Sequence, residues 1–440
     1  MITSVIGKAF LKVFNEKERT NLSAKEFFDQ IYFELFFNHP KYMQWVVNSP
    51  FVQMRNGQKV GTLTPEERLE KLEDLHRKIE KEREYPDASF ALGYPASEQN
   101  EFAGTSGLIA DIKVEVDEEE IYCSWIGSGL SLGVAGGYNL LINDPELLLF
   151  VFEGWKHYRK FLNDPTLTKM KTYQINSWNG QWLTYRLGKD YREDFSFSDL
   201  QSEGIFVINE GAIEVSTINW SNLYFSLSRY YPNGELLAYI YSFGKTNQTI
   251  GFIPIHLKSG TKLKDVCRQL YDGAERFDNK EFQALYGRHI KRACELGSIG
   301  LQALRPKNLE KYMEEVKNLT FKKKEDTIIY QAYKTWLVAM LSKNKQEITD
   351  YTQGLAHLIL RYRKGASGTE RKNLIENDLF GTKSKRTFIE ALTKMVAGVD
   401  GDDLKQLKEL KEEVHLMTNE EFIYFNTLLK FDYACTEKQS

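Results

Sequence analysis

The feature that most constrains the fold is a change of sequence texture near residue 262. Between about 108 and 256, short apolar runs alternate with turn residues, a pattern typical of strands. From about 262 onward, apolar residues recur at three- and four-residue spacing, which is typical of amphipathic helices. The sequence therefore predicts an α+β fold: a mixed, largely antiparallel, β-rich body over 1–290 that begins with helices, then a helical bundle over 291–440.

Apolar spacing and capping residues give the expected elements. Asp144 and Pro145 are typical of an N-cap and a first helical residue, and Asn179-Gly180 is typical of a hairpin turn. Helices are predicted over 24–38, 65–84, 145–162, 328–341, 351–362, 388–396, 404–414 and 422–429. Strands are predicted over 108–116, 121–126, 173–178, 182–187, 205–208, 213–220, 236–243 and 249–256.

The composition indicates a folded protein, and the length of 440 residues indicates two or three domains. A hydrophobic content of 42% and an aromatic content of 13% exclude a mainly disordered chain. No run reaches the ~20 apolar residues that cross a bilayer, and the first residues lack the pattern of a signal peptide. The four cysteines are scattered and form no CxxC pair. We therefore expect a reduced, cytoplasmic protein with no membrane contact, no metal and no cofactor.

The charges are unevenly distributed along the chain. Residues 305–395 contain 19 Lys and Arg against 11 Asp and Glu, whereas residues 396–440 contain 5 Lys against 10 acids. A basic stripe on helices suits a phosphate backbone, although the same pattern is typical of a solvated helix face. The sequence leaves both interpretations open. The candidate nucleic-acid contacts in this stretch are Lys322, Lys323, Lys324, Arg361, Arg363, Lys364, Arg371, Lys372, Lys383, Lys385 and Arg386.

A glycine-rich segment follows the predicted strand 121–126. Its GxGxxxG spacing departs from the dinucleotide-binding fingerprint, and no Gly-Lys-Ser/Thr follows it. The segment fits a nucleotide loop, a loop whose backbone amides meet a nucleic-acid backbone, or a structural turn. Its candidate binding residues are Gly127, Ser128, Gly129 and Ser131.

The predicted hairpin over 173–187 carries amides and indoles near its tip. Asn176, Asn179 and Gln181 could pair with base edges, and Trp178 could stack on a base or wedge between two steps. The alternative is a well-packed hairpin with buried indoles. These residues and the glycine-rich segment are therefore candidate contacts for nucleic acid.

Catalytic motifs are sparse in this sequence. Pro86-Asp87 with Asp111-Ile112-Lys113 fits the pattern PD…(D/E)xK, in which two carboxylates hold Mg²⁺ and a lysine orients water. Asp400 to Asp403 lacks the acidic residue that would complete a calcium loop, so it is interpreted as a helix cap. The sequence therefore predicts a non-catalytic protein, with a magnesium-dependent nuclease as the alternative.

Several stretches along most of the chain carry a resemblance to a known family. They are Ile6–Phe10, Asn21–Phe37, Asn48–Phe51, Phe90–Ala96, 127–137, Leu140–Asp144, Val414–Thr418 and Glu421–Phe425. In their order, the chain resembles the large subunit of type I CRISPR Cascade complexes, of the shorter I-A and I-B variety. It departs from that family in lacking the paired-cysteine zinc motif of some members. The resemblance implies that a DNA motif is read at the predicted hairpin and the glycine-rich segment.

The resemblance implies a non-catalytic role in antiviral defence. Such a subunit lies at the crRNA 5′-handle end of the complex, recognises the protospacer-adjacent motif on duplex DNA and supports opening of the duplex. The implied partners are crRNA, target double-stranded DNA, the backbone and handle-binding subunits, and a recruited helicase-nuclease. Besides the nuclease built on Asp87, Asp111 and Lys113, a cytoplasmic scaffold without a nucleic-acid role is the remaining alternative.

Overall fold

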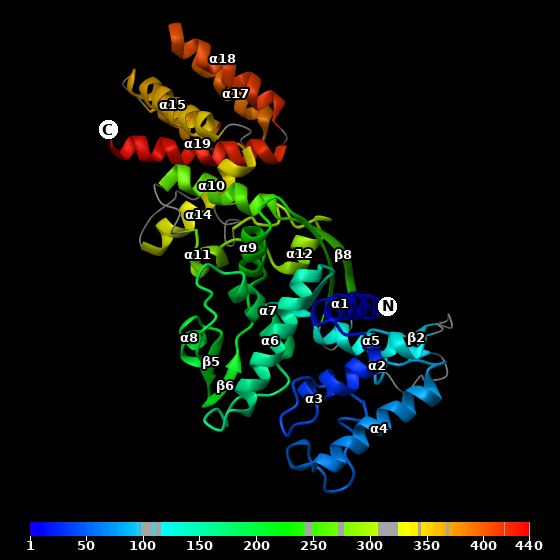
Figure 1. The fold of residues 1–440 in the computed structure, drawn as a ribbon. Coiled ribbons are helices and arrows are strands. Elements are labelled where there is room, and N and C mark those ends of the chain that lie inside the picture. Colours follow the sequence, from blue (N-terminus) through cyan, green and yellow to red (C-terminus); the bar gives the residue numbers. More distant parts are fainter. Residues whose placement is uncertain are drawn as a thin grey trace. The chain divides into compact units, whose positions relative to one another are not determined.

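The structure is a computed structural model of the 440-residue chain, which forms two compact units (Figure 1). The first unit contains residues 1–258 and 289–299, and the second contains residues 259–288 and 300–440. The chain crosses between the units three times, whereas the sequence predicts one boundary at residue 290. The residues described are 1–94, 96–97, 109–110, 116–242, 249–271, 277–306, 324–341, 345–366, 369–417 and 419–439.

A four-stranded antiparallel sheet lies in the first unit, in the order β3–β4–β7–β8. Every residue of β4 is buried, including the polar Asn139, so the strand is covered on both faces. The described strands are β3 (Leu132–Val134), β4 (Tyr138–Ile142), β7 (Glu235–Ser242), β8 (Thr249–His256), an antiparallel hairpin of β5 (Phe206–Asn209) and β6 (Ala212–Val215), and a parallel pair of β1 (Ala96–Ser97) and β2 (Ile109–Ala110).

Helices α1 (Ile2–Glu18) and α5 (Glu118–Gly129) cross with their backbones in contact. Gly127 makes this possible, because a Cβ atom at that position would lie 1.9 Å from the carbonyl oxygen of Thr3. Fully buried rings pack around the crossing, among them Phe10 and Trp155. The core of the first unit is therefore rich in aromatic contacts that fix α1 and α5 tightly together.

Helix α6 (Pro145–Asn163) begins where the sequence predicts, with the Asp144 carboxylate accepting a hydrogen bond from the Leu147 amide at 3.0 Å. Helix α7 (Ile175–Arg186) packs beside α6, and the rings of Tyr158 and Trp178 stack with centroids 5.4 Å apart. The remaining described helices of this unit are α8 (Phe197–Ser202), α9 (Trp220–Tyr230) and α12 (Ile290–Cys294).

The N-terminal helices that follow α1 hold the region of the candidate site. A continuous helical segment contains α2 (Ala24–Phe27), the π-helical η1 (Phe28–Tyr32) and α3 (Phe33–Phe36), in agreement with the buried helix predicted over 24–38. A loop and the short η2 (Val60–Thr62) lead from it to α4 (Pro65–Glu82), which the sequence also predicts.

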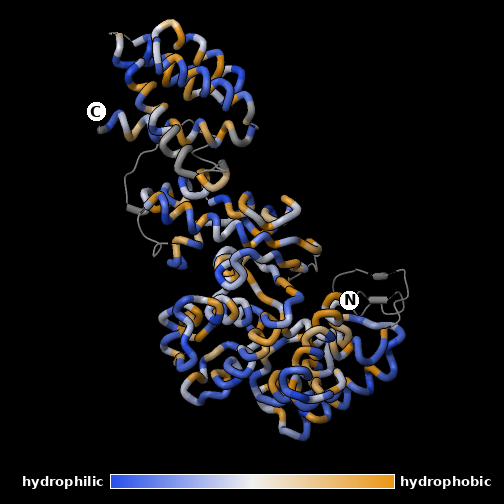
Figure 2. Tube along the Cα trace, turned by 45° about the horizontal axis from the view of Figure 1, so that its top comes forward, coloured by the Kyte–Doolittle hydropathy of each residue, from blue (hydrophilic) through white to orange (hydrophobic). Residues whose placement is uncertain are grey.

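The second unit is helical in its described parts. Its helices alternate hydrophobic and hydrophilic residues along their length (Figure 2), and one core joins Leu355, Phe388, Leu410 and Phe425. The helices are α10 (Lys258–Tyr271, of which Lys258 belongs to the first unit), α11 (Lys280–Ala284), α14 (Lys324–Leu341), α15 (Lys345–Lys364), α16 (Glu370–Asn373), η5 (Leu374–Leu379), α17 (Lys385–Val396), α18 (Gly401–Leu416) and α19 (Asn419–Gln439).

The predicted mixed α+β fold with C-terminal helices is confirmed, although several strands lie at other positions than expected, among them β3 and β4. The strands predicted over 121–126, 173–178 and 182–187 are wrong, because these segments belong to α5 and α7. Most of the strand predicted over 108–116 lies outside the described residues. Among the residues that the structure describes, no helix combines the length and the apolar character needed to cross a membrane.

Candidate functional site

The glycine-rich segment is a buried junction rather than an open loop. Gly127 and Gly129 lie in the last turn of α5, and a Cβ atom at Gly129 would lie 3.0 Å from the ring of Tyr32. Ser128 accepts a hydrogen bond from the Gln44 side chain at 3.1 Å, and Ser131 is fully buried. The prediction of a loop that cradles phosphate is therefore wrong in its geometry, and the structural-turn interpretation fits.

The predicted hairpin is helix α7, so Asn179-Gly180 forms no turn. The indole of Trp178 is fully buried and donates a hydrogen bond to the Gly154 carbonyl at 2.8 Å. Gln181 donates to the Ser216 carbonyl at 3.0 Å. These side chains make hydrogen bonds inside the fold. The predicted stacking on a base, wedging between two steps and pairing with base edges all require an exposed hairpin, which this segment does not form.

The two predicted reading segments contact each other. Asn179 is fully buried and its amide donates to the carbonyls of Gly129 at 2.7 Å and Ser131 at 3.0 Å, while Asn176 donates to the Ser131 hydroxyl. These bonds satisfy carbonyls at the C-terminal end of α5, which would otherwise lack partners. The sequence therefore identifies residues that meet in space, but they meet to close the turn between α5 and β3.

Most of the predicted basic residues in the bundle have partners. Arg361 pairs with Asp403, and Arg363 pairs with Glu437 and also donates to the Tyr433 hydroxyl at 2.8 Å. The other partners are local or backbone groups: Glu376 for Lys372 at 4.0 Å, Glu390 for Arg386 at 3.0 Å, the Tyr362 carbonyl for Arg371 at 2.6 Å and the Met417 carbonyl for Lys385 at 2.7 Å.

Much of the positive excess in 305–395 is neutralised by ion pairs with the acidic residues that follow it. The acidic last 45 residues supply Asp403, Asp432 and Glu437, which pair with cations of α14 and α15. Lys364 and Lys383 are exposed on the bundle. Lys322 and Lys323 lie outside the described residues, as does the side chain of Lys324, the first residue of α14.

Asp87, the first carboxylate of the nuclease alternative, has a structural role in a turn. Its side chain is 2% exposed and accepts a hydrogen bond from the Ser89 amide at 2.7 Å. Asp111 and Lys113 lie outside the described residues. Within the parts of the chain that are described, no group of three His, Cys, Asp or Glu side chains is placed to hold a metal ion.

A cationic groove of about 550 Å³ lies between α4 and the loop that precedes it. Five cationic and two acidic side chains line it, so the lining has a net positive charge. The loop contributes Pro50, Gln53, Met54 and Arg55, and the helix contributes Lys71, Asp74, Arg77, Lys78, Lys81 and Glu82. We refer to this site as the α4 groove.

The sequence of α4 directs these residues toward the groove. Thr64 forms a capping box with Glu67, which fixes the start of the helix, and Leu72, Leu75 and Ile79 are buried on the face that packs on the body. Positions 71, 74, 78 and 81 follow one another at three- or four-residue spacing, so they lie along one side of the helix. Helix geometry therefore sets the cations in a row.

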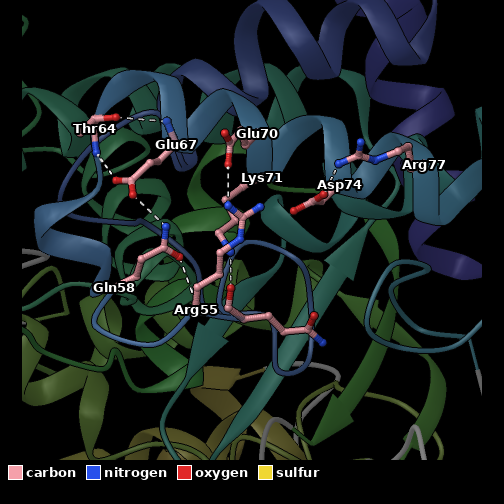
Figure 3. A network of polar contacts seen from close by, with 9 residues as sticks. Arg55, Gln58, Thr64, Glu67, Glu70, Lys71, Asp74 and Arg77 are labelled. Atoms are coloured by element: carbon pink, nitrogen blue, oxygen red, sulfur yellow. Dashed lines mark hydrogen bonds and ion pairs between the residues drawn. The ribbon is translucent and has the colours of Figure 1, made fainter.

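The loop is fastened to α4 at one end of the groove (Figure 3). Gln58 donates from its side chain to the Glu67 carboxylate at 2.8 Å and accepts from the Arg55 amide at 3.0 Å. The Lys71 ammonium donates to the carbonyl of Gln53. The loop residues that line the groove are therefore held by the first two turns of the helix.

The cations of the groove are held loosely by exposed carboxylates. Arg55 and Glu70 pair at 3.2 Å with side chains 66% and 55% exposed. Arg77 pairs with Asp74, three residues before it. Lys78 is 3.8 Å from Glu82 and donates to the Ser89 hydroxyl at 2.6 Å, whereas Lys81 makes no hydrogen bond or ion pair with the described residues. Such exposed pairs contribute about 0.2–1 kcal/mol each and exchange readily.

Lys71 differs from the other cations because it is only 6% exposed. Burial lowers the pKa of its ammonium below the usual value, Asp74 opposes that shift, and the positive charge of Arg55 adds to it. Arg55 and Lys71 lie next to each other in the groove (Figure 3). Two neighbouring cations of this kind favour an anion between them.

The charge pattern of the sequence assigns the polar side of α4 to solvent and does not reveal the groove. One sequence signal for the groove exists, because Lys71, Lys78 and Lys81 share one side of the predicted helix. The contribution of Arg55 cannot be found from spacing, since the loop reaches the helix through tertiary contacts. Comparisons with protein-family models, with curated proteins and with solved structures found no match for this chain.

Proposed function

We propose that this protein binds nucleic acid without cleaving it, and that the α4 groove contacts the phosphate backbone. The observation that carries the proposal is the convergence of five cations on an open groove. The three cations that form ion pairs do so with exposed or half-exposed carboxylates. A phosphate oxygen can replace such a carboxylate at small cost, and each neutralised phosphate releases a condensed counterion.

The dimensions of the groove suit a strand. Lys71 and Lys81 are ten residues apart on α4, which corresponds to about 15 Å along the helix axis. Phosphates of one DNA strand follow each other every 3.4 Å of duplex axis, so this length faces about four of them. The arrangement reads no bases, and it would therefore position a nucleic acid rather than select its sequence.

The resemblance to Cascade large subunits makes the proposal more specific. We propose that the chain is the large subunit of a type I CRISPR surveillance complex, with crRNA, target duplex DNA and the other Cascade subunits as partners. In that setting the α4 groove is a contact for one of the two nucleic acids. Recognition of a protospacer-adjacent motif remains part of this proposal. Because Trp178 and Asn179 are buried, we expect residues other than these two to read the motif.

The first experiment measures the affinity of the whole chain for labelled duplex DNA, single-stranded DNA and RNA at several salt concentrations. The double variant Arg77→Gln/Lys81→Gln should weaken binding to all sequences alike. It should also lower the slope of log affinity against log salt, by about 0.9 for each duplex phosphate that the variant no longer neutralises, or about 0.7 on a single strand. Lys160→Gln, which removes an exposed charge from α6, is the matched control.

A parallel triple variant, Lys322→Gln/Lys323→Gln/Lys324→Gln, tests the basic segment of the bundle in the same assay. Binding that does not depend on salt, or that the groove variant leaves unchanged, contradicts the role of the α4 groove. The specific proposal is tested by purifying the protein from its host. Copurification of a guide RNA with further subunits supports it, and recovery of the chain alone speaks against it.

A further inference from the structure

The two ends of the α4 groove differ in how they are built. At the Arg55–Lys71 end, the loop is tied to the helix by the pairs Gln58–Glu67, Arg55–Glu70 and Lys71–Gln53. All the hydrogen bonds and ion pairs that the structure gives between the loop residues 50–58 and α4 lie at or before Lys71. The groove is therefore fastened at one end, and it is free of such ties toward Lys81.

The fastened end also holds the most buried cation of the groove, Lys71, which is 6% exposed. The buried Lys71 ammonium donates to one carbonyl and forms no ion pair with the described residues. An ammonium has three donors, so two remain for a ligand. Arg55 lies beside it with a planar donor fork that suits phosphate oxygens. Together the two side chains provide two positive charges, and an anionic group that takes the place of the exposed Glu70 carboxylate on Arg55 can contact both.

We infer that the Arg55–Lys71 end binds the terminal phosphate of a nucleic-acid strand. This inference rests on the proposed function and adds which part of the strand enters the groove. A terminal phosphomonoester carries a charge of about −1.5 to −2 at neutral pH, which matches two cations better than the single charge of an internal phosphate. The next phosphates of the strand then follow α4 toward Lys78 and Lys81.

The volume of the groove agrees with a short bound segment. Sites that enclose small ligands usually measure about 300–1,000 Å³, and the α4 groove measures about 550 Å³. The open groove therefore has room for a nucleotide-sized ligand, and the rest of the strand leaves past Lys81. The chemistry is the same for a 5′-phosphate and a 3′-phosphate, so the experiment has to distinguish the two ends.

The test uses the whole chain and short oligonucleotides of one sequence in three forms: with a 5′-phosphate, with a 3′-phosphate, and with hydroxyl groups at both ends. We expect one phosphorylated form to bind about tenfold more tightly than the hydroxyl form. Arg55→Gln should abolish this preference, whereas Arg77→Gln/Lys81→Gln should weaken all three forms by a similar factor. Inorganic phosphate should compete with the preferred form more strongly than with the hydroxyl form.

Arg55 is the better residue for this test because its side chain is exposed, while Lys71 also fastens the Gln53 carbonyl. Lys71→Met is measured together with its melting temperature, and loss of the preference at unchanged melting temperature supports the inference. Equal, salt-dependent binding of all three forms overturns the inference and leaves the proposed function intact. A preference that survives Arg55→Gln also overturns it, and failure to bind any form overturns both.

Discussion

The α4 groove and the C-terminal bundle both gather cations, but they neutralise them differently. In the groove, Arg55 and Glu70 meet as two exposed side chains. In the bundle, Lys334 and Asp432 are 11% and 3% exposed, and Asp432 also accepts a hydrogen bond from the Thr352 hydroxyl at 2.7 Å. A pair removed from water is costly to break, whereas an exposed pair exchanges its partner readily.

This difference shows why a count of charges does not locate a binding surface. The stretch 305–395 has the larger positive excess in sequence, yet several of its cations are occupied by acids from the next 45 residues. Helix α4 contains seven Asp and Glu against five Lys and Arg, yet it presents cations whose partners are exposed or half-exposed. Whether a cation is available to a ligand depends on how buried its acidic partner is and on how far away that partner lies in the sequence.

The largest effect is expected from Asp432→Ala, which leaves the Lys334 ammonium and the Thr352 hydroxyl without this carboxylate in the bundle. Removing one member of a buried pair costs about 3–5 kcal/mol, so the free energy of unfolding of the C-terminal unit should fall by that amount in urea titration. Glu390→Ala, which breaks the exposed pair with Arg386, is the control and should change stability by less than about 0.5 kcal/mol. Equal effects of the two variants would remove the distinction between the regions.

Lys430 is the bundle cation that departs from this pattern. Burial, together with a smaller contribution from the nearby charge of Lys383, lowers its pKa to about 8. An unfolded lysine keeps its proton up to about pH 10.4, so between about pH 8 and 10.4 the unfolded state binds more protons and stability rises with pH. Below pH 8 both states are charged, and the folded protein bears the full cost of the buried charge.

Lys430→Met should therefore stabilise the protein at pH 7, by about 1–3 kcal/mol. The gain should shrink as the pH approaches 10, because the wild-type lysine is then neutral in the folded state. Urea titrations of both proteins at pH 7, 8.5 and 10 check this. A gain that is independent of pH would mean that packing of the methionine, rather than the buried charge, is responsible.

A smaller effect is expected when the half-exposed pairs of the bundle are opened. The double variant Asp403→Asn/Glu437→Gln frees Arg361 and Arg363, and it should lower the free energy of unfolding by about 1 kcal/mol. It should also raise the affinity for duplex DNA severalfold, because two arginines become available. An unchanged affinity would confine nucleic-acid binding to the α4 groove, while a gain would assign part of it to the bundle.

Local signals in the sequence are sufficient for part of the fold. Helices α4 and α6 begin at Pro65 and Pro145, where the sequence predicts, because capping and the first helical residues depend on near neighbours. Bundle helices such as α17 are also predictable, since α17 has one apolar face and the spacing of that face is visible in the chain.

Helix α7 cannot be recognised in the same way. Nearly all of its residues are buried, so it has no polar face and no helical period. Trp178 and Trp182 are typical of strands, and Asn179-Gly180 is typical of a turn, but tertiary packing overrides both preferences. Gly180 is needed because a Cβ atom there would lie 2.3 Å from the Gly133 carbonyl oxygen, a contact that no local pattern reveals.

The candidate site is beyond the reach of sequence patterns for a related reason. Part of the α4 groove comes from a loop that lacks a periodic signal, and its position depends on side-chain bonds such as Gln58–Glu67. Pairs such as Arg363–Glu437 join residues that are 74 positions apart, so free and occupied cations look alike in the sequence.

The smallest effect is expected from Glu70→Gln, a variant that tests whether an exposed carboxylate of the groove competes with a ligand. Glu70→Gln releases Arg55 from its pair, and since such pairs contribute about 0.2–1 kcal/mol, affinity for a nucleic-acid strand should rise about 1.5- to 5-fold. Glu73→Gln removes the same charge from α4 at an exposed position that does not line the groove, so it reports the general change in the electrostatic field of the helix.

Both variants are compared by direct binding at one salt concentration. A larger gain for Glu70→Gln than for Glu73→Gln means that the carboxylate and the phosphate compete for the same guanidinium. Equal gains mean that Arg55 acts only through the overall charge of the helix, and the groove would then differ from the bundle in exposure but not in the availability of its cations.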